Sequence, residues 1–240
     1  MIEITSKNNQ KVKDAAALKQ KKYRQEKGLF LMEGSKNLEM ALRFGNVKEI
    51  YTSIGLPKIK KQDIEVYKVT DEIIRKLANS ENPEGVVFVC EFVKPRKQKD
   101  EYSKIIYLDH ISDPGNLGTI IRTAVAFNYD AVILSEGSVD LYNEKVLAAT
   151  KGAISAIDIL IDDIRNYDHR IIVSTLNEKS VSLNDCQKLS DFILVLGNES
   201  HGVSDEITAL ADLCVKIEMS DNIDSLNVAV AAGILMNYYK

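Results

Sequence analysis

The stretch Leu108-Asp109-His110-Ile111-Ser112-Asp113-Pro114-Gly115-Asn116-Leu117-Gly118-Thr119-Ile120-Ile121-Arg122-Thr123-Ala124 joins an apolar segment to a helix through a polar turn. The apolar residues 104–108 predict a strand, and the Asp, Pro and Gly residues after them predict a tight turn. The following residues predict a helix over 116–127 that carries one arginine among small and apolar side chains. Strand, glycine-containing turn and helix in this order are typical of α/β proteins, which place ligands at such turns.

The turn lacks the signatures of nucleotide-phosphate binding. No Gly-Lys-Ser/Thr follows Gly118, so it is not a Walker loop, and Gly-x-Gly-x-x-Gly is absent. A nucleotide-dependent α/β enzyme is therefore disfavoured, and binding of ATP or NAD would restore that alternative. From this stretch alone, Arg122 is either an exposed or salt-bridged helix residue or an arginine that binds an anion or stabilises a transition state.

The chain from residue 103 to 240 alternates predicted strands and helices. The strands cover 105–108, 131–134, 156–160, 171–174, 192–196 and 215–217, and the helices cover 116–127, 143–151, 204–211 and 225–239. This alternation predicts a largely parallel sheet with helices on both faces.

The first part of the chain predicts a smaller α/β domain over residues 1–93. Its helices cover 11–27, 35–44 and 71–78, with Asn8 or Asn9 as the first cap, Gly28 and Gly45 as helix ends and Thr70 as the last cap. Its strands cover 29–32, 47–51, 65–69 and 85–92. The charged, proline-containing segment 94–102 is predicted to be a linker, and residues 103–240 form the second domain.

Charge is distributed unevenly between these parts. Residues 1–100 contain 21 Lys and Arg against 14 Asp and Glu, whereas residues 101–240 contain 10 against 21. The basic part is suited to bind a polyanion. The alternative is that both parts simply have solvated charged surfaces with no role in binding.

Composition limits the other classes of function. Hydrophobic residues make up 45% of the 240 residues, enough for a sizeable core. The three cysteines are scattered and show no metal-ligand spacing with the three histidines, so we expect reduced thiols and no metal. The N-terminus shows no signal peptide, and the longest apolar run, 228–236, is too short to span a bilayer, so we expect a soluble cytoplasmic protein with no membrane partner.

Two further turns follow predicted strands. The turn over 197–202 contains Glu199 between two glycines, and Gly197 is expected to let a ligand approach the backbone closely. The loop over 218–227 precedes a helix of small apolar residues, and Ser225 is expected to cap that helix. His201 is interpreted as a surface histidine without a role.

Taken together, the three turns resemble the three motifs of the SpoU (TrmH-type) RNA 2′-O-ribose methyltransferases, of the SPOUT class. The motifs are Asp-Pro-x-Asn-x-Gly-x-x-x-Arg-Thr-Ala, Gly-Asn-Glu-x-x-Gly, and Ile-x-Met followed by Ser-Leu-Asn-Val, all within residues 104–240. Phe30-Leu31-Met32-Glu33-Gly34 and Asn82-Pro83-Glu84-Gly85-Val86 look like the small, ribosomal-protein-like RNA-binding domain that precedes the catalytic domain in many members.

The resemblance implies an α/β catalytic domain with a deep trefoil knot near the C-terminus, which no periodicity would suggest. It implies S-adenosyl-L-methionine as the cofactor, held in the knot largely by main-chain atoms of the second and third motif loops. Carried over to this chain, the cofactor-binding residues are Thr175, Leu176, Gly197, Ile217, Met219 and Leu226.

The resemblance likewise implies the residues that act on the RNA. Arg122 matches the catalytic arginine, and Asn116, Glu199, Ser225 and Asn227 match the other motif side chains. We expect Arg122 to bind the neighbouring phosphate and stabilise the developing alkoxide, because a guanidinium stays charged and is a poor base. Asn116 and Glu199 are expected to orient Arg122 and the loops. Glu218 stands where the family usually has proline, and Ala229 where it often has serine.

The resulting hypothesis is a methyltransferase that modifies a ribose 2′-hydroxyl of structured RNA, most of all ribosomal RNA, and works as a homodimer through the knot region. Two alternatives stay open: a transfer RNA ribose methyltransferase, and a non-catalytic RNA-binding protein that retained the fold. The basic first domain would bind RNA through phosphate contacts.

Overall fold

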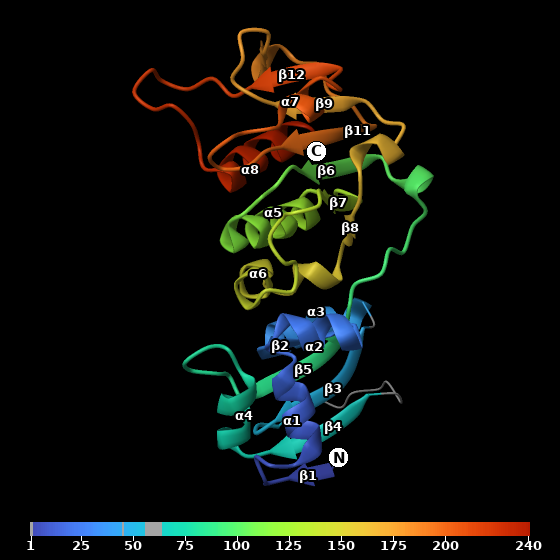
Figure 1. Cartoon of the computed structure of the whole chain (residues 1–240), viewed down its shortest axis with the longest axis vertical. Coiled ribbons are helices and arrows are strands. Elements are labelled where there is room, and N and C mark those ends of the chain that lie inside the picture. The colour runs from blue at the N-terminus through green and yellow to red at the C-terminus, as the bar shows by residue number, and fades with distance from the viewer. Residues whose placement is uncertain (1, 45, 56–63) are drawn as a thin grey trace. The chain divides into compact units, whose positions relative to one another are not determined.

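The computed structural model describes residues 2–44, 46–55 and 64–240, which form two compact units (Figure 1). Unit 1 contains the residues up to Val93 together with Tyr142–Ala156, and unit 2 contains Lys94–Leu141 and Ile157–Lys240. The segment 142–156 belongs in sequence to the predicted second domain but packs with the residues of the first. Gly45, expected to end a helix, lies outside the described residues.

Unit 1 is built on a five-stranded mixed sheet in the order β1-β4-β3-β5-β2. Strands β1, β4 and β3 are parallel to one another, and β5 runs antiparallel to β3 and β2. The strands are β1 (Ile2–Ile4), β2 (Leu29–Glu33), β3 (Val47–Thr52), β4 (Glu65–Val69) and β5 (Val86–Glu91). The helices are α1 (Gln10–Ala17), α2 (Lys21–Lys27), α3 (Ser35–Phe44), α4 (Asp71–Leu77) and α6 (Glu144–Thr150), with a 3-10 turn, η2 (Ala153–Ser155). Strand β1 was not predicted from the sequence.

The prediction of one helix over residues 11–27 is wrong, because the chain breaks it into α1 and α2. Leu18 is buried in the core at the break. The buried Arg24 donates hydrogen bonds from Nη1 to the carbonyl oxygens of Leu18 and Lys19, at 3.1 and 2.8 Å, which satisfies carbonyl groups that the broken helix leaves open. The predicted ends are confirmed: Asn9 caps α1, and Gly28 ends α2 in the left-handed region, at φ 64°.

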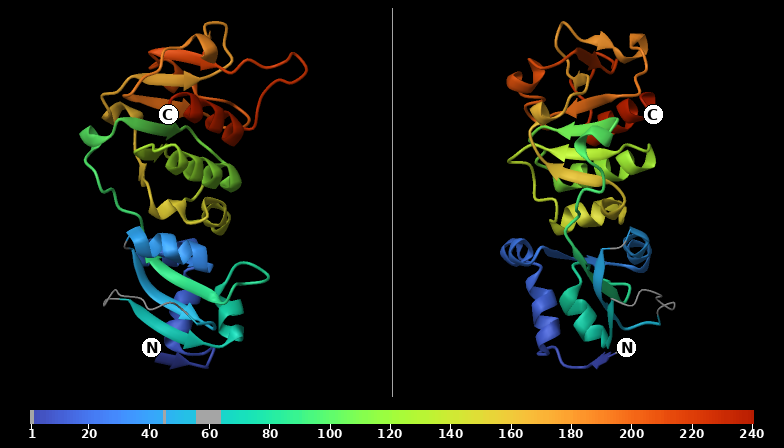
Figure 2. Two further views of the ribbon diagram at one scale, coloured as in Figure 1. Left: turned by 180° about the vertical axis from the view of Figure 1, so that it is seen from behind. Right: turned by 90° about the vertical axis from the view of Figure 1, so that its right-hand side faces the viewer.

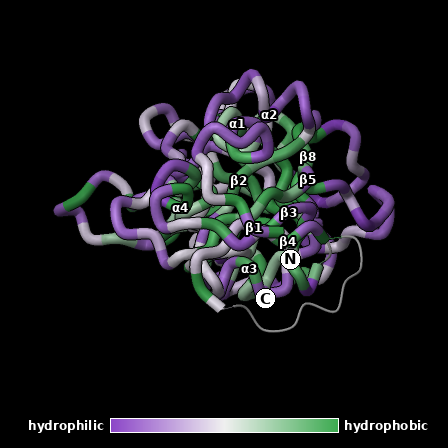
Figure 3. Tube along the Cα trace, turned by 90° about the horizontal axis from the view of Figure 1, so that it is seen from below, coloured by the Kyte–Doolittle hydropathy of each residue, from purple (hydrophilic) through white to green (hydrophobic). Residues whose placement is uncertain are grey.

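The core of unit 1 lies on both faces of its sheet. On one face, side chains of α1 and α4 such as Val12, Ile73 and Leu77 pack on the strands. Tyr142 joins the unit through ring contacts with Phe30 and Phe92, whose ring centres lie 4.7 and 3.9 Å away. In Figure 3, β2 and β5 of this unit are largely hydrophobic, whereas α1 and α2 present hydrophilic residues.

Unit 2 is built on a seven-stranded sheet in the order β10-β12-β9-β11-β6-β7-β8, and every pairing is parallel. The prediction of a parallel α/β sheet is confirmed. The strands are β6 (Lys104–Leu108), β7 (Ala131–Leu134), β8 (Asp158–Ile161), β9 (Ile171–Ser174), β10 (Val181–Ser182), β11 (Phe192–Leu196) and β12 (Leu213–Lys216). The helices are α5 (Pro114–Ala126), α7 (Asp205–Thr208) and α8 (Val228–Tyr238), with 3-10 turns η1 (Lys99–Glu101), η3 (Ile164–Asn166) and η4 (Leu183–Asp185).

Alternate residues of the strands face opposite sides of this sheet. Ile105, Tyr107, Ile193 and Val195 share one cluster with Ile207 of α7 and with η3. Their neighbours along the strands point to the other face, where α5 and α8 pack together (Figures 1 and 2). The central strands are buried on both faces, which explains why residues 192–196 read as an uninterrupted apolar run.

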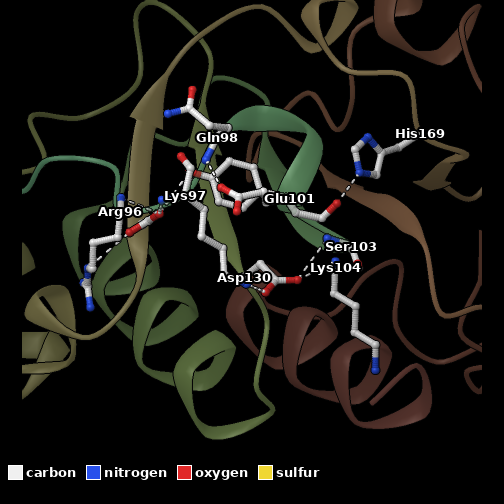
Figure 4. A network of polar contacts seen from close by, with 10 residues as sticks. Arg96, Lys97, Gln98, Glu101, Ser103, Lys104, Asp130 and His169 are labelled. Atoms are coloured by element: carbon white, nitrogen blue, oxygen red, sulfur yellow. Dashed lines mark hydrogen bonds and ion pairs between the residues drawn. The ribbon is translucent and has the colours of Figure 1, made fainter.

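The predicted linker is attached to unit 2 along much of its length (Figure 4). Asp158, buried at the start of β8, accepts hydrogen bonds from the main-chain N–H groups of Arg96 and Lys97, at 2.8 and 3.1 Å. It also accepts one from the hydroxyl of Tyr102, at 3.0 Å. Asp130 accepts from the N–H groups at the start of β6. These two carboxylates hold the segment 94–102 on unit 2, whereas its charged composition alone predicts a solvated linker.

Other structural expectations concern thiols, metals and membranes. The three cysteines are free, and Cys90 is buried. Among the described residues, no group of three or more His, Cys, Asp and Glu side chains is arranged to hold a metal ion. In the same part of the chain, no helix has both the length and the apolar character needed to cross a bilayer.

Candidate functional site

The three motif turns meet at one edge of the unit 2 sheet. Strands β12, β9, β11 and β6 are neighbours and parallel, so their carboxyl ends lie at the same edge. The segments that leave this edge begin at Ile217, Thr175, Gly197 and Asp109, respectively. Residues separated by more than 100 positions in the sequence are therefore brought to one place.

Glu199 connects the second motif turn to the first. One oxygen of its carboxylate, Oε2, accepts hydrogen bonds from the N–H and the hydroxyl of Ser112, at 3.3 and 2.9 Å. The other, Oε1, accepts from the N–H of Asp113 at 3.2 Å and from Nδ2 of Asn116 at 2.9 Å. Asp113 in turn caps α5, accepting from the N–H of Asn116 at 2.7 Å. One carboxylate thus fixes the entry into α5.

This network requires Glu199 to be ionised. Partial burial raises the pKa of Glu199, but hydrogen bonds from Asn116, Ser112 and main-chain N–H groups outweigh burial and lower its pKa to about 2. The folded state therefore favours the carboxylate more than the unfolded chain does. Its stabilising contribution is complete above the ordinary value of 4.5 and is lost as the pH falls from there towards 2.

We expect Glu199→Gln to lower the free energy of unfolding at neutral pH. The difference from wild type should shrink between about pH 4.5 and pH 2, because the wild-type carboxylate becomes protonated there. Urea unfolding at a series of pH values measures this. Glu178→Gln, at an exposed glutamate of the same unit, is the control. A difference that stays constant over this pH range would contradict the role given to the charge.

Asn227 connects the third motif to the other two. Its Nδ2 donates to Oδ1 of Asn116, at 2.9 Å. Its own Oδ1 accepts from the N–H groups of Ala229 and Val230, at 2.9 and 3.3 Å, so Asn227 caps α8. The prediction that Ser225 caps this helix is wrong, because the helix begins only at Val228, and Ser225 lies exposed in the preceding loop.

Replacing Asn227 by alanine should cost about 1 kcal/mol of stability, the usual loss for an N-cap. The matched variant Ser225→Ala should change stability by less than about 0.5 kcal/mol, as expected at an exposed site without such a contact. Denaturant titration of both variants separates them, and equal losses would refute the assignment of the cap.

Gly197 occupies a place that only glycine can fill. A Cβ atom at this position would lie 2.1 Å from the carbonyl carbon of Gly202 and 2.1 Å from the nitrogen of Val203. The turn folds back on itself there, with reciprocal main-chain hydrogen bonds of 2.9 Å between Asn198 and Gly202. The chain itself therefore makes the close approach at Gly197, whereas the sequence led us to expect a ligand there.

Arg122 lies on α5 with its side chain exposed. In the part of the chain that the structure describes, no side chain forms a hydrogen bond or ion pair with it. The structure therefore joins Asn116, Glu199 and Asn227 into one network and leaves Arg122 and Ser225 outside it. A guanidinium without a partner among the described residues is available to bind an anion.

The residues expected to bind the cofactor follow β9, β11 and β12. Gly197 is buried, Thr175, Ile217, Met219 and Leu226 are half-buried, and Leu176 is 55% exposed. Within residues 2–44, 46–55 and 64–240, the main-chain groups of Gly197, Ile217, Met219 and Leu226 form no hydrogen bonds. Apolar side chains beside free main-chain donors and acceptors suit an adenosine joined to a methionine, so these residues fit S-adenosylmethionine.

Sequence reasoning missed the side chains that fasten the turns together. Asp109 is buried, accepts from the N–H of Ser204 at 2.8 Å through Oδ2, and contacts His110 through Oδ1. Asn198 donates from Nδ2 to the carbonyl oxygen of His110, at 2.8 Å. The sequence does contain a signal for these contacts, because the polar pair Asp109 and His110 directly follows an apolar strand.

Comparisons with known proteins agree with this arrangement. A model of the "SpoU rRNA Methylase family" matches residues 103–237, and one of the "MRM3-like substrate binding domain" matches residues 9–87. The chain is 32% identical to the 23S rRNA (guanosine(2553)-2′-O)-methyltransferase RlmP of Bacillus subtilis, with 100% of both chains covered.

Two solved structures of similar proteins match nearly the whole chain. A crystal structure of an AdoMet-bound rRNA methyltransferase from Sinorhizobium meliloti is 30% identical, with a TM-score of 0.88 over 99% of this chain and 96% of the other. An RNA 2′-O ribose methyltransferase is 25% identical, with a TM-score of 0.79 over 99% and 98% of the two chains.

Proposed function

Because the chain belongs to the SpoU rRNA methylase family, we propose that it methylates the ribose 2′-hydroxyl of a guanosine in 23S ribosomal RNA. The predicted family and enzyme class are confirmed: it is an RNA 2′-O-methyltransferase that uses S-adenosylmethionine. The observation that carries the narrower proposal is the similarity to RlmP, which extends over both units rather than over the catalytic part alone.

The cofactor is proposed to bind where the segments after β9, β11 and β12 meet. Free main-chain groups of Ile217, Met219 and Leu226 would hold the adenosine and methionine parts, and Thr175 and Leu176 would border the site from the neighbouring strand. Gly197 contributes by allowing the tight turn beside it. When bound, the cofactor supplies an electrophilic methyl group.

Arg122 is proposed to act on the RNA. Its exposed guanidinium would bind the phosphate next to the target ribose and stabilise negative charge as the 2′-oxygen attacks the methyl group. A guanidinium stays charged in proteins and is a poor base, so Arg122 is not proposed to remove the proton. The 2′-hydroxyl proton therefore leaves to phosphate or water.

Glu199, Asn116 and Asn227 are proposed as positioning residues. Their hydrogen bonds join three loops and the starts of α5 and α8, which fixes α5, the helix that carries Arg122. Ser225 is exposed two residues before this network and would contact the cofactor or the RNA.

We propose that residues near the C-terminus form the trefoil knot of the family and pair two copies of the chain. After β11 the chain crosses β9 to reach β12 and then returns to pack α8 on α5. Helix α8 exposes Val230 and Ile234, one turn apart and 52% and 39% accessible. Sedimentation should give twice the chain mass of 26.8 kDa, and a monomer at micromolar concentration would contradict the pairing.

Residues 1–93, which make up most of unit 1, are proposed to bind the RNA before methyl transfer, and residues 103–240 are proposed as the catalytic domain. The exposed lysines of α2 and Lys13 of α1 would provide phosphate contacts, whereas Lys11 is already paired with Glu49 and Glu65. The protein is proposed to work in the cytoplasm, where it would meet ribosomal RNA. Affinity for RNA should fall steeply between 50 and 200 mM salt, by about 10³-fold or more if six phosphates are contacted. A flat response would contradict this division of roles.

The test of the target is mass mapping of 2′-O-methyl groups in ribosomal and transfer RNA from cells with and without the protein. We expect one 23S ribosomal RNA guanosine to lose its methyl group. A change confined to transfer RNA would favour the transfer RNA alternative, and no change in either RNA would favour a non-catalytic RNA-binding protein.

A further inference from the structure

His110 is held in an unfavourable backbone conformation at the centre of the first motif turn. Its φ is 54°, in the left-handed region that non-glycine residues seldom occupy. Its N–H donates to Oγ of Ser135 at 2.8 Å, and its carbonyl oxygen accepts from Nδ2 of Asn198 at 2.8 Å. Both main-chain groups are therefore fastened, one to the segment after β7 and one to the second motif turn.

The imidazole ring of His110 is fixed as well. Its Nδ1 lies 2.7 Å from Oδ1 of Asp109, whose carboxylate is buried and also accepts from the N–H of Ser204. The ring lies beside Gly137, where a Cβ atom would come within 3.4 Å of the ring carbon Cδ2. Gly137 itself has a φ of 82°, which suits glycine.

This fixed ring is nevertheless open to solvent. The His110 side chain is 60% exposed, and no described residue forms a hydrogen bond with its Nε2. A residue that only forms an ion pair or packs in the core does not need a strained backbone, a buried carboxylate that orients it and a solvent-exposed ring at the same time. Strain that the surrounding structure maintains is typical of functional sites.

The location of His110 indicates which molecule contacts its ring. Ser112 and Asp113, in the same turn, bind Glu199, and Asn198, which holds the His110 carbonyl, precedes Glu199 in sequence. His110 therefore shares the rigid framework of the proposed methyl-transfer site. Two molecules are proposed to bind at this edge, and the cofactor is assigned to the segments after β9, β11 and β12, which leaves the turn after β6 to the RNA. Single-stranded nucleotides are commonly bound by stacking on aromatic and imidazole rings.

We infer that His110 is a substrate-binding residue that stacks against an unpaired nucleobase of the RNA, with Asp109 fixing the ring for this contact. The inference rests on the proposed function and adds a nucleobase contact to it. Positions of the backbone are set before binding, so little conformational entropy is lost when the base stacks.

Two substitutions test the contact. His110→Asn and His110→Gly both tolerate a positive φ, and this gain opposes the cost of removing the ring from the buried Asp109 carboxylate, so the protein should still fold. With unmodified 23S rRNA transcript as the probe, we expect each to raise the KM for RNA roughly 5- to 150-fold, the range for losing one base–aromatic contact. The dissociation constant for S-adenosylmethionine should not worsen.

Asn128→Gly is the matched control, because Asn128 also has a positive φ, 58°, but follows the far end of α5. It should leave the KM for RNA unchanged. A KM for the His110 variants within twofold of wild type would overturn the inference, as would a parallel loss of cofactor affinity and melting temperature, which indicates a structural role. Failure of the proposed function is distinct: the wild type itself would then transfer no methyl group to RNA, while RNA binding by the variants would still report on His110.

Discussion

Arg122→Lys should lower kcat for methyl transfer by about 100-fold, in the range found when one preorganised donor to a developing oxyanion is removed. Lysine keeps the positive charge but loses the planar pair of N–H donors that fits a phosphate. Because Arg122 is exposed and none of the described residues pairs with it, the substitution should leave stability within about 0.5 kcal/mol. Single-turnover assays with saturating cofactor measure the effect.

Arg165→Lys provides the control for this experiment. Arg165 is another arginine of unit 2, but its guanidinium is already paired with Asp163 and Glu206. This variant should retain wild-type kcat. Full activity of Arg122→Lys would mean that charge alone suffices and that the guanidinium geometry plays no part in the reaction.

Gly197→Ala should destabilise unit 2 by about 3 kcal/mol or more and abolish cofactor binding. The new methyl group would collide with main-chain atoms of Gly202 and Val203 at 2.1 Å, and main chain cannot move aside as a flexible side chain can. The turn that carries Glu199 must therefore open. Urea unfolding and calorimetric titration with S-adenosylmethionine measure the two effects.

The control is Gly55→Ala, at a glycine whose Cβ position has no atom of the described residues within 4 Å and whose φ lies outside the left-handed region. It should fold and bind cofactor as the wild type does. If Gly197→Ala behaves in the same way, the turn is more adaptable than its main-chain packing implies, and the site does not depend on this close approach.

The sequence predicted the parallel sheet well because its strands are buried on both faces. Residues 104–108 and 192–196 are continuous apolar runs bounded by polar turns, and each became a strand at nearly the predicted positions. The helix over 11–27 was predicted as one element because the caps recognised for it, Asn8 or Asn9 and Gly28, lie at its two ends. Tertiary contacts decided the break, since Leu18 is a core residue and Arg24 binds the carbonyl groups there.

The candidate site was predictable only in part. Asn116, Glu199 and Asn227 came from the family resemblance, and the structure shows them in one hydrogen-bonded network. Asp109 and His110 lie in the opening stretch itself, yet their roles depend on partners 25 to 95 positions away in the chain. Local patterns do not encode such contacts.

The charge pattern of the segment 94–102 does not reveal its contacts, for the same reason. The segment 94–102 has the composition of a free linker, but its main-chain N–H groups bind the buried Asp158. A buried carboxylate needs such partners, and the sequence does not reveal which residues supply them.

The central claim is that the three motif turns form one site for methyl transfer to ribose. The most direct measurement is transfer of a labelled methyl group from S-adenosylmethionine to unmodified 23S ribosomal RNA, followed by digestion to nucleosides. We predict 2′-O-methylguanosine as the labelled product with wild type, and about 100-fold slower labelling with Arg122→Lys. Label on a base, or no label at all, would contradict the account.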